Sequence, residues 1–242
     1  MLSSAHILIT GCSRGLGLEM VKQLAIRETP PALILATCRY PETAGRLQEL
    51  AEQYNNIKMI KFDVDKLDNL TEFSRTVSCL TDRLDILINN AGISPKATRI
   101  NLVSPEQMER TLHTNLIAPL FITKALINIL AKPVEGPGSL VVNISSILGS
   151  IAENTKQGGL YPYRCSKAGL NALTRSLSID LKHQNISAVS IHPGWVKTDM
   201  GGNNAPLTAA QSIQGVLSFL DEFKPEEHNG NFYDNIGNPL PW

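Results

Sequence analysis

The feature that most constrains the fold is a glycine-rich turn near the start of the sequence. Residues 6–10 (HILIT) form a short apolar run, and after the turn apolar side chains recur at helical spacing. A strand, a tight turn and a helix in this order are typical of a βαβ unit, in which the amides at the helix start can bind a pyrophosphate. The spacing is G-x-x-x-G-x-G, and a tight turn without a ligand is the alternative. We favour a dinucleotide site formed by Gly11, Ser13, Arg14, Gly15, Leu16 and Gly17.

The end of the second predicted strand, residues 33–38, indicates which dinucleotide binds. In the usual dinucleotide fold an acidic residue at this place accepts hydrogen bonds from the ribose hydroxyls, whereas an arginine accommodates a 2′-phosphate. Here the strand is followed by Arg39, and Arg14 could supply a second positive charge to the same phosphate. Two solvated surface arginines are the alternative. The sequence therefore favours NADP(H) over NAD(H).

The rest of the chain repeats the alternation of strand and helix. Further strands are expected at residues 57–62, 86–88, 139–145, 187–192 and 230–233, and helices at 44–53, 67–80, 104–130, 161–182 and 206–220. A length of 242 residues without a repeat or linker suits one α/β domain, residues 1–242. Residues 195–206 are rich in glycine and asparagine and suggest a mobile flap over a site.

Small and polar residues follow two of these strands. Asp63 and Val64 follow the third, where they could meet the adenine edge, although an ordinary turn aspartate fits Asp63 equally well. The fourth is followed by Asn89-Asn90-Ala91-Gly92. We expect Asn89 to brace neighbouring strands, and a cofactor to pack against Asn90, Ala91 and Gly92.

A tyrosine and a lysine at helical spacing supply candidate chemistry. Tyr163 and Lys167 lie one turn apart on a helix face, so the ammonium can stabilise the phenolate and lower the tyrosine pKa towards neutral, as a general acid requires. The same pattern also occurs on ordinary helix faces. Asn115 lies inside the predicted 104–130 helix, where it could distort the helix and hold a water with the freed backbone groups.

In this order and spacing, the motifs resemble the short-chain dehydrogenase/reductase superfamily over essentially the whole chain. The matching elements are Thr10-Gly11-x-x-x-Gly15-x-Gly17, Asn89-Asn90-Ala91-Gly92, Asn115, Ser145-Ser146, Tyr163-x-x-x-Lys167 and Pro193-Gly194 with Thr198. The resemblance implies a Rossmann-like α/β fold, a doubly wound parallel sheet of about seven strands in the order 3-2-1-4-5-6-7. The cofactor would lie across the carboxyl ends of the strands.

The resemblance also implies roles for individual residues. It implies a catalytic group of Asn115, Ser146, Tyr163 and Lys167, and cofactor contacts from Tyr163, Lys167, Pro193, Gly194, Val196 and Thr198. The family pattern favours Ser146 over Ser145. Ser146 precedes Tyr163 by 17 residues (163 − 146), a somewhat longer gap than is usual in the family.

The expected activity is NADPH-dependent reduction of aldehydes and ketones. Tyr163 would donate a proton to the carbonyl oxygen, Ser146 would donate a second hydrogen bond, and Asn115 would hold a water in a proton relay. Apolar pocket candidates are Leu148, Trp195 and Met200. A 3-oxoacyl or hydroxysteroid reductase is an alternative on the same fold. A non-catalytic NADP(H) sensor is another, but such a protein should have lost the acid.

Composition limits the partners. The 22 basic and 22 acidic residues balance, so neither a nucleic-acid surface nor a polybasic membrane tether is expected. No run approaches the ~18 apolar residues of a membrane span. The four cysteines contain no C-x-x-C pair and no signal peptide is recognised, which indicates a reducing cytoplasm and no metal site.

We expect a small-molecule carbonyl substrate. The 104–130 and 161–182 helices carry apolar residues on more than one face. In the family these two helices form the dimer contact, so we expect a homodimer.

Overall fold

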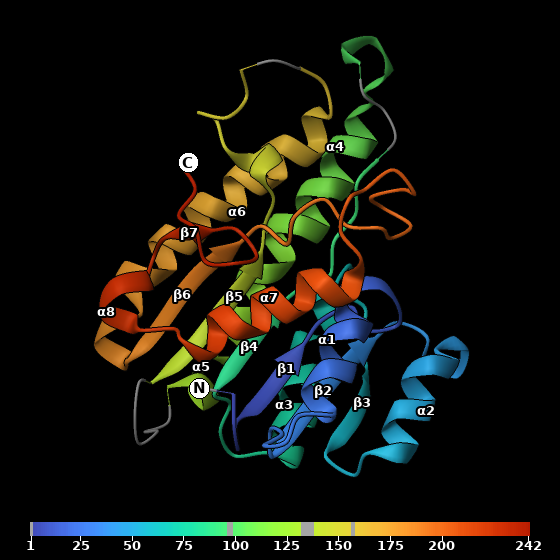
Figure 1. Ribbon diagram of the computed structural model, residues 1–242, viewed down its shortest axis with the longest axis vertical. Helices are drawn as coiled ribbons and strands as arrows, with labels where there is room; N and C mark the ends of the chain where they lie inside the picture. The colour runs from blue at the N-terminus through green and yellow to red at the C-terminus, as the bar shows by residue number, and fades with distance from the viewer. Residues whose placement is uncertain (1, 96–98, 132–137, 156–157) are drawn as a thin grey trace.

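A seven-stranded parallel sheet forms the centre of the molecule (Figure 1). The computed structural model describes residues 2–95, 99–131, 138–155 and 158–242. The strand order is β3-β2-β1-β4-β5-β6-β7, the order that the family resemblance implies. The strands are β1 His6–Ile9, β2 Leu33–Cys38, β3 Ile57–Lys61, β4 Ile86–Asn89, β5 Ser139–Ile144, β6 Ile186–Ile191 and β7 Phe232–Tyr233.

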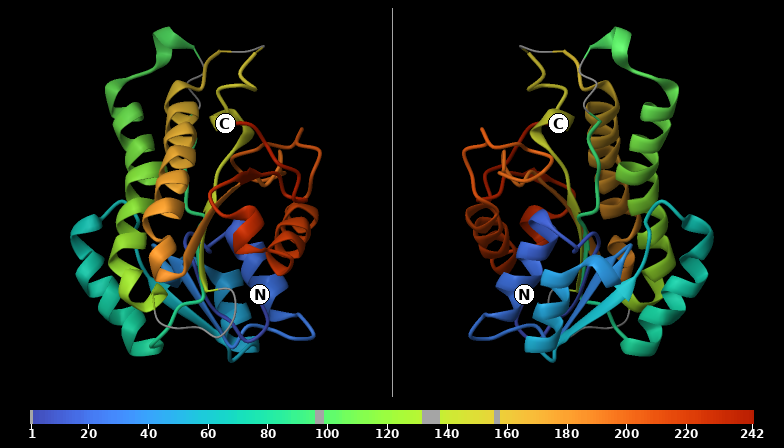
Figure 2. Two further views of the ribbon diagram at one scale, coloured as in Figure 1. Left: turned by 90° about the vertical axis from the view of Figure 1, so that its left-hand side faces the viewer. Right: turned by 90° about the vertical axis from the view of Figure 1, so that its right-hand side faces the viewer.

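Helices cover both faces of this sheet (Figure 2). One face carries α1 Gly15–Ala25, α2 Gly45–Gln53 and α7 Ala209–Asp221, and the other carries α3 Leu70–Leu80, α4 Pro105–Leu112, α5 Ala118–Leu130 and α6 Tyr161–Asp180. The short α8 spans Pro225–His228. Because both faces are covered, the central strands are largely apolar: Ile7 and Ile9 pack towards α1 and α7, while Leu8 packs towards α3 and α5. The fold is the doubly wound α/β architecture expected from the sequence.

The predicted 104–130 helix has an interruption at its middle. Its start is as expected, with a capping box between Ser104 and Gln107 and a proline at the first helical position. At His113–Ile117 the helix widens into a single π turn that contains Asn115. A π turn inside an α-helix often marks a functional site. The expected distortion at Asn115 is therefore confirmed.

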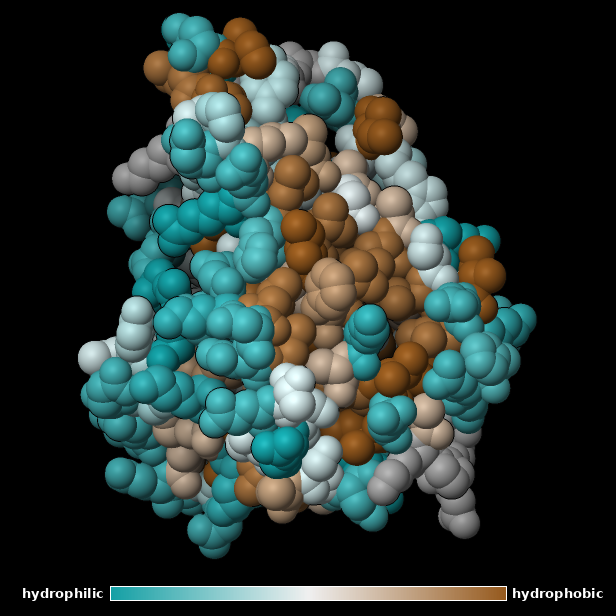
Figure 3. Space-filling model, turned by 180° about the vertical axis from the view of Figure 1, so that it is seen from behind, coloured by the Kyte–Doolittle hydropathy of each residue, from teal (hydrophilic) through white to brown (hydrophobic). Residues whose placement is uncertain are grey.

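Several apolar side chains are exposed on the outer face of the π turn, α5 and α6. Ile117, Leu120 and Phe121 remain partly exposed, and Ile179 of α6 is 65% exposed. Figure 3 shows apolar side chains gathered in the middle of this side of the molecule. By length and composition alone, Pro105–Leu130 could cross a membrane, but 44% of its most apolar window is buried within the protein. It packs against α6 and α3 as a core helix does.

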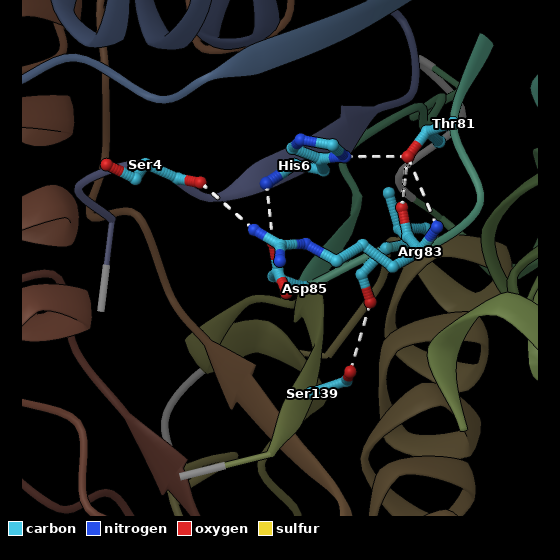
Figure 4. Close-up of polar contacts among 7 residues, drawn as sticks. Ser4, His6, Thr81, Arg83, Asp85 and Ser139 are labelled. Atoms are coloured by element: carbon cyan, nitrogen blue, oxygen red, sulfur yellow. Dashed lines mark hydrogen bonds and ion pairs between the residues drawn. The ribbon is translucent and has the colours of Figure 1, made fainter. Parts of the chain in front are cut away.

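A cluster of polar side chains lies at the amino end of the sheet (Figure 4). The Thr81 hydroxyl donates to the Arg83 carbonyl at 2.6 Å, so His6 Nδ1, 2.6 Å from the same oxygen, acts as donor to Thr81. Asp85 Oδ2 accepts from the His6 amide at 2.6 Å and lies 3.4 Å from Arg83 Nε. These bonds join the start of β1 to the segment that leads into β4.

Candidate active site

The glycine turn forms a cradle at the carboxyl end of β1. Gly11 has a φ of +73°, and a Cβ there would lie 3.0 Å from Ala91 Cα. A Cβ on Gly17 would lie 2.4 Å from the Gly11 carbonyl oxygen, so neither position tolerates a side chain. Within the described residues, no side chain caps the first turn of α1, and that turn contains no acidic residue. Its amides are therefore available to an anion, and the turn fits a pyrophosphate.

The turn is bound directly to the segment that follows β4. Asn90 Nδ2 donates to the carbonyl oxygens of Thr10 at 2.8 Å and Gly11 at 3.2 Å. The hydroxyl of Thr10 accepts from the amides of Asn90 and Ala91, each at 3.0 Å. The Asn90 amide group thus supports the cradle from behind. Asn89 braces β4 against β5 through a 2.9 Å bond from its Nδ2 to Asn143 Oδ1, as expected.

The two arginines considered for a 2′-phosphate differ in their surroundings. Arg39 is exposed just beyond β2, with its guanidinium carbon 5.9 Å from the ring centre of Tyr40. Arg14 Nε lies 3.1 Å from Asp199 Oδ2, and both side chains are largely exposed. An ion pair in water is weak, so it leaves Arg14 able to exchange Asp199 for a phosphate. Asp199 is a partner of the turn that the sequence did not indicate.

The acidic residue after β3 is turned towards its own loop. Asp63 Oδ1 accepts from the Asp65 amide at 3.1 Å, the geometry of an Asx turn. Val64 is buried in the core on the α3 side. The contact of these two residues with an adenine edge therefore stays a prediction.

Asn115 is fully buried, and both polar atoms of its side chain are hydrogen-bonded. Oδ1 accepts from the Ile93 amide at 2.8 Å, while Nδ2 donates to the Ile93 carbonyl at 2.8 Å and to Ser166 Oγ at 3.0 Å. The Ser166 hydroxyl donates to the Tyr163 carbonyl at 2.7 Å. Asn115 therefore links the π turn to α6 through Ser166. The Y-x-x-S-K sequence contained Ser166, but nothing in one sequence indicated this contact.

Ser146, Tyr163 and Lys167 meet at the carboxyl end of β5. The Ser146 side chain lies beside the Tyr163 hydroxyl, and its Oγ accepts from the Leu148 amide at 3.2 Å. Lys167 Nζ donates to the Ile144 carbonyl at 2.7 Å and lies 5.7 Å from the centre of the Tyr163 ring. A Cβ on Gly92 would come within 3.2 Å of Asn115 Oδ1 and 3.8 Å of Lys167 Nζ, so glycine opens the space beside these groups. The structure brings the four predicted catalytic residues together.

The pKa of Tyr163 moves against the expected direction. Burial raises the pKa of its hydroxyl, and the Ser146 hydrogen bond offsets this in part. Burial also lowers the pKa of Lys167 to about 8, which leaves the ammonium mostly charged at neutral pH. The expected lowering of the tyrosine pKa is therefore wrong for the protein chain, because desolvation of the phenolate is the largest effect. The hydroxyl stays protonated at neutral pH, as a proton donor must.

The segment after β6 is ordered against the glycine turn. Gly194 has a φ of +84° next to Pro193, whose carbonyl accepts from Ser212 Oγ at 2.5 Å. Val196 is buried and pairs with Leu207, and Thr198 Oγ1 accepts from the Gly201 amide at 3.1 Å. Trp195 Nε1 donates to the Gly201 carbonyl at 2.8 Å. The predicted flap thus has an internal hydrogen-bond framework.

Thr198 brings this segment to the cradle. Its Cγ2 lies 3.8 Å from the place of a Cβ on Gly15. The predicted cofactor residues therefore gather at the carboxyl edge of the sheet, at the ends of β1, β2, β3, β4 and β6, with Tyr163 and Lys167 beside the end of β5. A dinucleotide that spans this edge can reach the catalytic group.

This fold and arrangement define the class. The chain belongs to the short-chain dehydrogenase family, whose model matches residues 5–207. Members of this class are oxidoreductases, and so is this chain.

Two solved carbonyl reductases and one curated relative are similar to it. Carbonyl reductase Sniffer of D. melanogaster has a TM-score of 0.95 and 42% identity, with 98% of this chain and 99% of that chain covered. NADPH-bound carbonyl reductase from chicken fatty liver has a TM-score of 0.93 and 34% identity, with both chains fully covered. C-signal of Myxococcus xanthus is 43% identical over 162 residues, which cover 67% of this chain and 95% of that protein.

Proposed function

We propose that this protein is an NADPH-dependent carbonyl reductase that acts on aldehydes and ketones. The observation that carries the proposal is the group at the end of β5, where the Ser146 side chain lies beside the Tyr163 hydroxyl and the Lys167 ammonium lies beside the Tyr163 ring. Both solved structures described above cover nearly the whole chain, and both are carbonyl reductases.

NADP(H) is the cofactor that fits the carboxyl edge of the sheet. The cradle of Gly11, Gly15 and Gly17 suits a pyrophosphate, and exposed Arg14 and Arg39 suit a 2′-phosphate. One similar structure contains NADPH. Thr198 would contact the nicotinamide carboxamide or a phosphate, while Pro193, Gly194 and Val196 would line the same end of the cofactor.

When bound, NADPH supplies a hydride to the substrate carbonyl carbon. Tyr163 donates its hydroxyl proton to the carbonyl oxygen, and Ser146 Oγ donates a second hydrogen bond as charge develops there. The Lys167 ammonium stabilises the negative charge left on Tyr163 and binds the ribose hydroxyls. The π turn frees a backbone carbonyl near Asn115, which can hold a water that returns a proton to Tyr163.

Two structural expectations belong to the same proposal. Residues 1–242 act as one domain in the cytoplasm, and two copies pair through the apolar faces of α5 and α6. A monomeric mass in sedimentation at micromolar protein would contradict the dimer.

The test is NADPH consumption with quinones, aldehydes, diketones, steroids and acyl thioesters, each with wild type and Tyr163→Phe. We expect turnover with small aldehydes or ketones that the variant loses. Turnover confined to steroids or acyl thioesters would favour the alternative reductases. Binding of NADPH without turnover on any compound would favour a non-catalytic sensor.

A further inference from the structure

The two serines at the end of β5 have different partners. Ser145 is buried, and its Oγ donates to Asn171 Oδ1 at 2.6 Å, with the main-chain oxygen of Lys167 at 3.5 Å. The Ser145 amide donates to the Ile191 carbonyl of β6 at 2.7 Å. Ser146 faces Tyr163, whereas Ser145 joins the sheet to α6.

This contact belongs to a paired arrangement along α6. Asn171 lies four residues after Lys167, one turn further on the same helix face. Lys167 binds the carbonyl of Ile144, the residue before Ser145. Ile144, the last residue of β5, and Ser145, which follows it, therefore hold two successive turns of α6. Gly149 packs closely against the main chain of α6, since a Cβ there would lie 2.7 Å from the Lys167 carbonyl carbon.

We propose that Ser145 and Asn171 are positioning residues that fix where α6 docks along β5, and hence where Tyr163 and Lys167 lie relative to Ser146. The apolar contacts beneath α6, from Leu170 and Leu177, are non-directional and define this position less sharply. A hydrogen bond 2.6 Å long between two buried side chains defines it closely. The proposal rests on the proposed function, because it assumes that Ser146, Tyr163 and Lys167 do the chemistry.

The next polar contact between α6 and the sheet provides a matched control. Ser190 is fully buried in β6, and its Oγ donates to Thr174 Oγ1 at 2.8 Å. Ser190→Ala removes the same atoms in the same interface, but Thr174 lies further from the catalytic turn and keeps its bond from Asn143 Nδ2 at 2.9 Å.

The experiment measures kcat, the KM for the carbonyl substrate and the Kd for NADPH in Ser145→Ala, Asn171→Ala and Ser190→Ala. We expect kcat to fall by at least about tenfold in the first two variants, since a displacement near 1 Å can cost ~10²-fold. NADPH affinity should stay close to wild type. Ser190→Ala should keep the wild-type kcat. Wild-type kcat in both Ser145→Ala and Asn171→Ala would overturn the proposal.

A double variant separates position from stability. Ser145→Ala leaves the Asn171 amide buried without its partner, whereas Ser145→Ala with Asn171→Leu replaces both polar groups by apolar ones, which proteins tolerate better. We expect the double variant to recover the melting temperature but not kcat. Parallel recovery of both would show that the pair only stabilises the fold.

A last readout needs no turnover. The ionisation of Tyr163 can be followed by ultraviolet difference titration of each variant against the same variant carrying Tyr163→Phe. Ser145→Ala should shift the Tyr163 titration relative to wild type, and Ser190→Ala should not. If wild type reduces no carbonyl, the proposed function fails, while this titration still decides whether Ser145 positions α6.

Discussion

The sheet carries a polar cluster at each end, and similar residue types have different roles in the two clusters. At the amino end, Thr81 and Asp85 bind main-chain atoms of Arg83 and His6 and so tie strand segments together (Figure 4). At the carboxyl end, Asn115 bonds to Ile93, Lys167 bonds to Ile144, and Ser146 Oγ accepts from the Leu148 amide, each through main-chain atoms. The Tyr163 hydroxyl lies beside Ser146 and bonds to no main-chain atom among the described residues. A hydroxyl group that no main-chain bond holds distinguishes the candidate site from the structural cluster.

The largest expected effect comes from a substitution in the carboxyl-end cluster that leaves the fold intact. Tyr163→Phe removes the proton donor and should lower kcat by about 10²–10⁴-fold, with NADPH binding retained. Steady-state kinetics and fluorescence titration of NADPH measure the two quantities. Tyr161→Phe, an exposed position at the start of the same helix, is the control. More than a tenth of wild-type turnover in Tyr163→Phe would refute the role.

The next effect concerns the preference for NADPH over NADH, which depends on Arg14 and Arg39 at the carboxyl edge of the sheet. Two guanidiniums on a 2′-phosphate should give about a hundredfold preference for NADPH over NADH in kcat/KM, from roughly 1.5 kcal/mol for each charged bond. Arg39→Asp should remove most of that preference. Arg75→Asp, on exposed α3, makes the same charge change on the other face and should leave the preference unaltered. An unchanged NADPH-to-NADH ratio in Arg39→Asp would contradict the assignment.

A smaller effect follows from a partly buried histidine beside the site. His192 Nδ1 has no hydrogen-bond partner among the described residues, and burial lowers the pKa of His192 to about 4, against the opposing effect of Asp234. Between the unfolded pKa of 6.5 and about 4, the unfolded chain binds more protons, so stability falls as the pH falls through this window.

The measurement is urea unfolding across that pH range. The loss should be on the order of 2 kcal/mol, because the part-exposed ring retains some solvation. His192→Asn should flatten the pH dependence, and His183→Asn, at an exposed position, should not. Equal slopes in wild type and His192→Asn would rule out this source.

The smallest effect breaks the amino-end cluster. Thr81→Val removes the acceptor of His6 Nδ1 and a donor to the Arg83 carbonyl, and should cost about 1.5 kcal/mol in the free energy of unfolding. Carbonyl reduction should be unchanged, because the cluster lies at the far end of the sheet. Thr76→Val on the exposed face of α3 is the matched control. A loss of kcat without a loss of stability would contradict the division between the two ends.

Local signals in the sequence were enough to locate the strands and most residues of the candidate site, while the strand order came from the family resemblance. Apolar runs and turn residues predicted all seven strands within a few residues, and the capping box gave the start of α4. The Asn115 distortion could be expected because asparagine disfavours a helix interior. The sequence could not indicate the Ser166 link, the Asp199 ion pair or the direction in which the pKa of Tyr163 shifts. Each depends on contacts or burial between segments that only the folded chain brings together.

The π turn at His113–Ile117 has a consequence for the helix that follows it. A wider turn accommodates an extra residue, and each residue of an α-helix advances the direction of its side chains by about 100°. The apolar positions of α5 are therefore rotated out of phase with those of α4. Deleting a single residue within this turn would rotate Ile117, Leu120 and Phe121 to a new direction and withdraw Asn115 from Ile93 at once. The π turn thus determines both the outer surface of the helix and the position of Asn115.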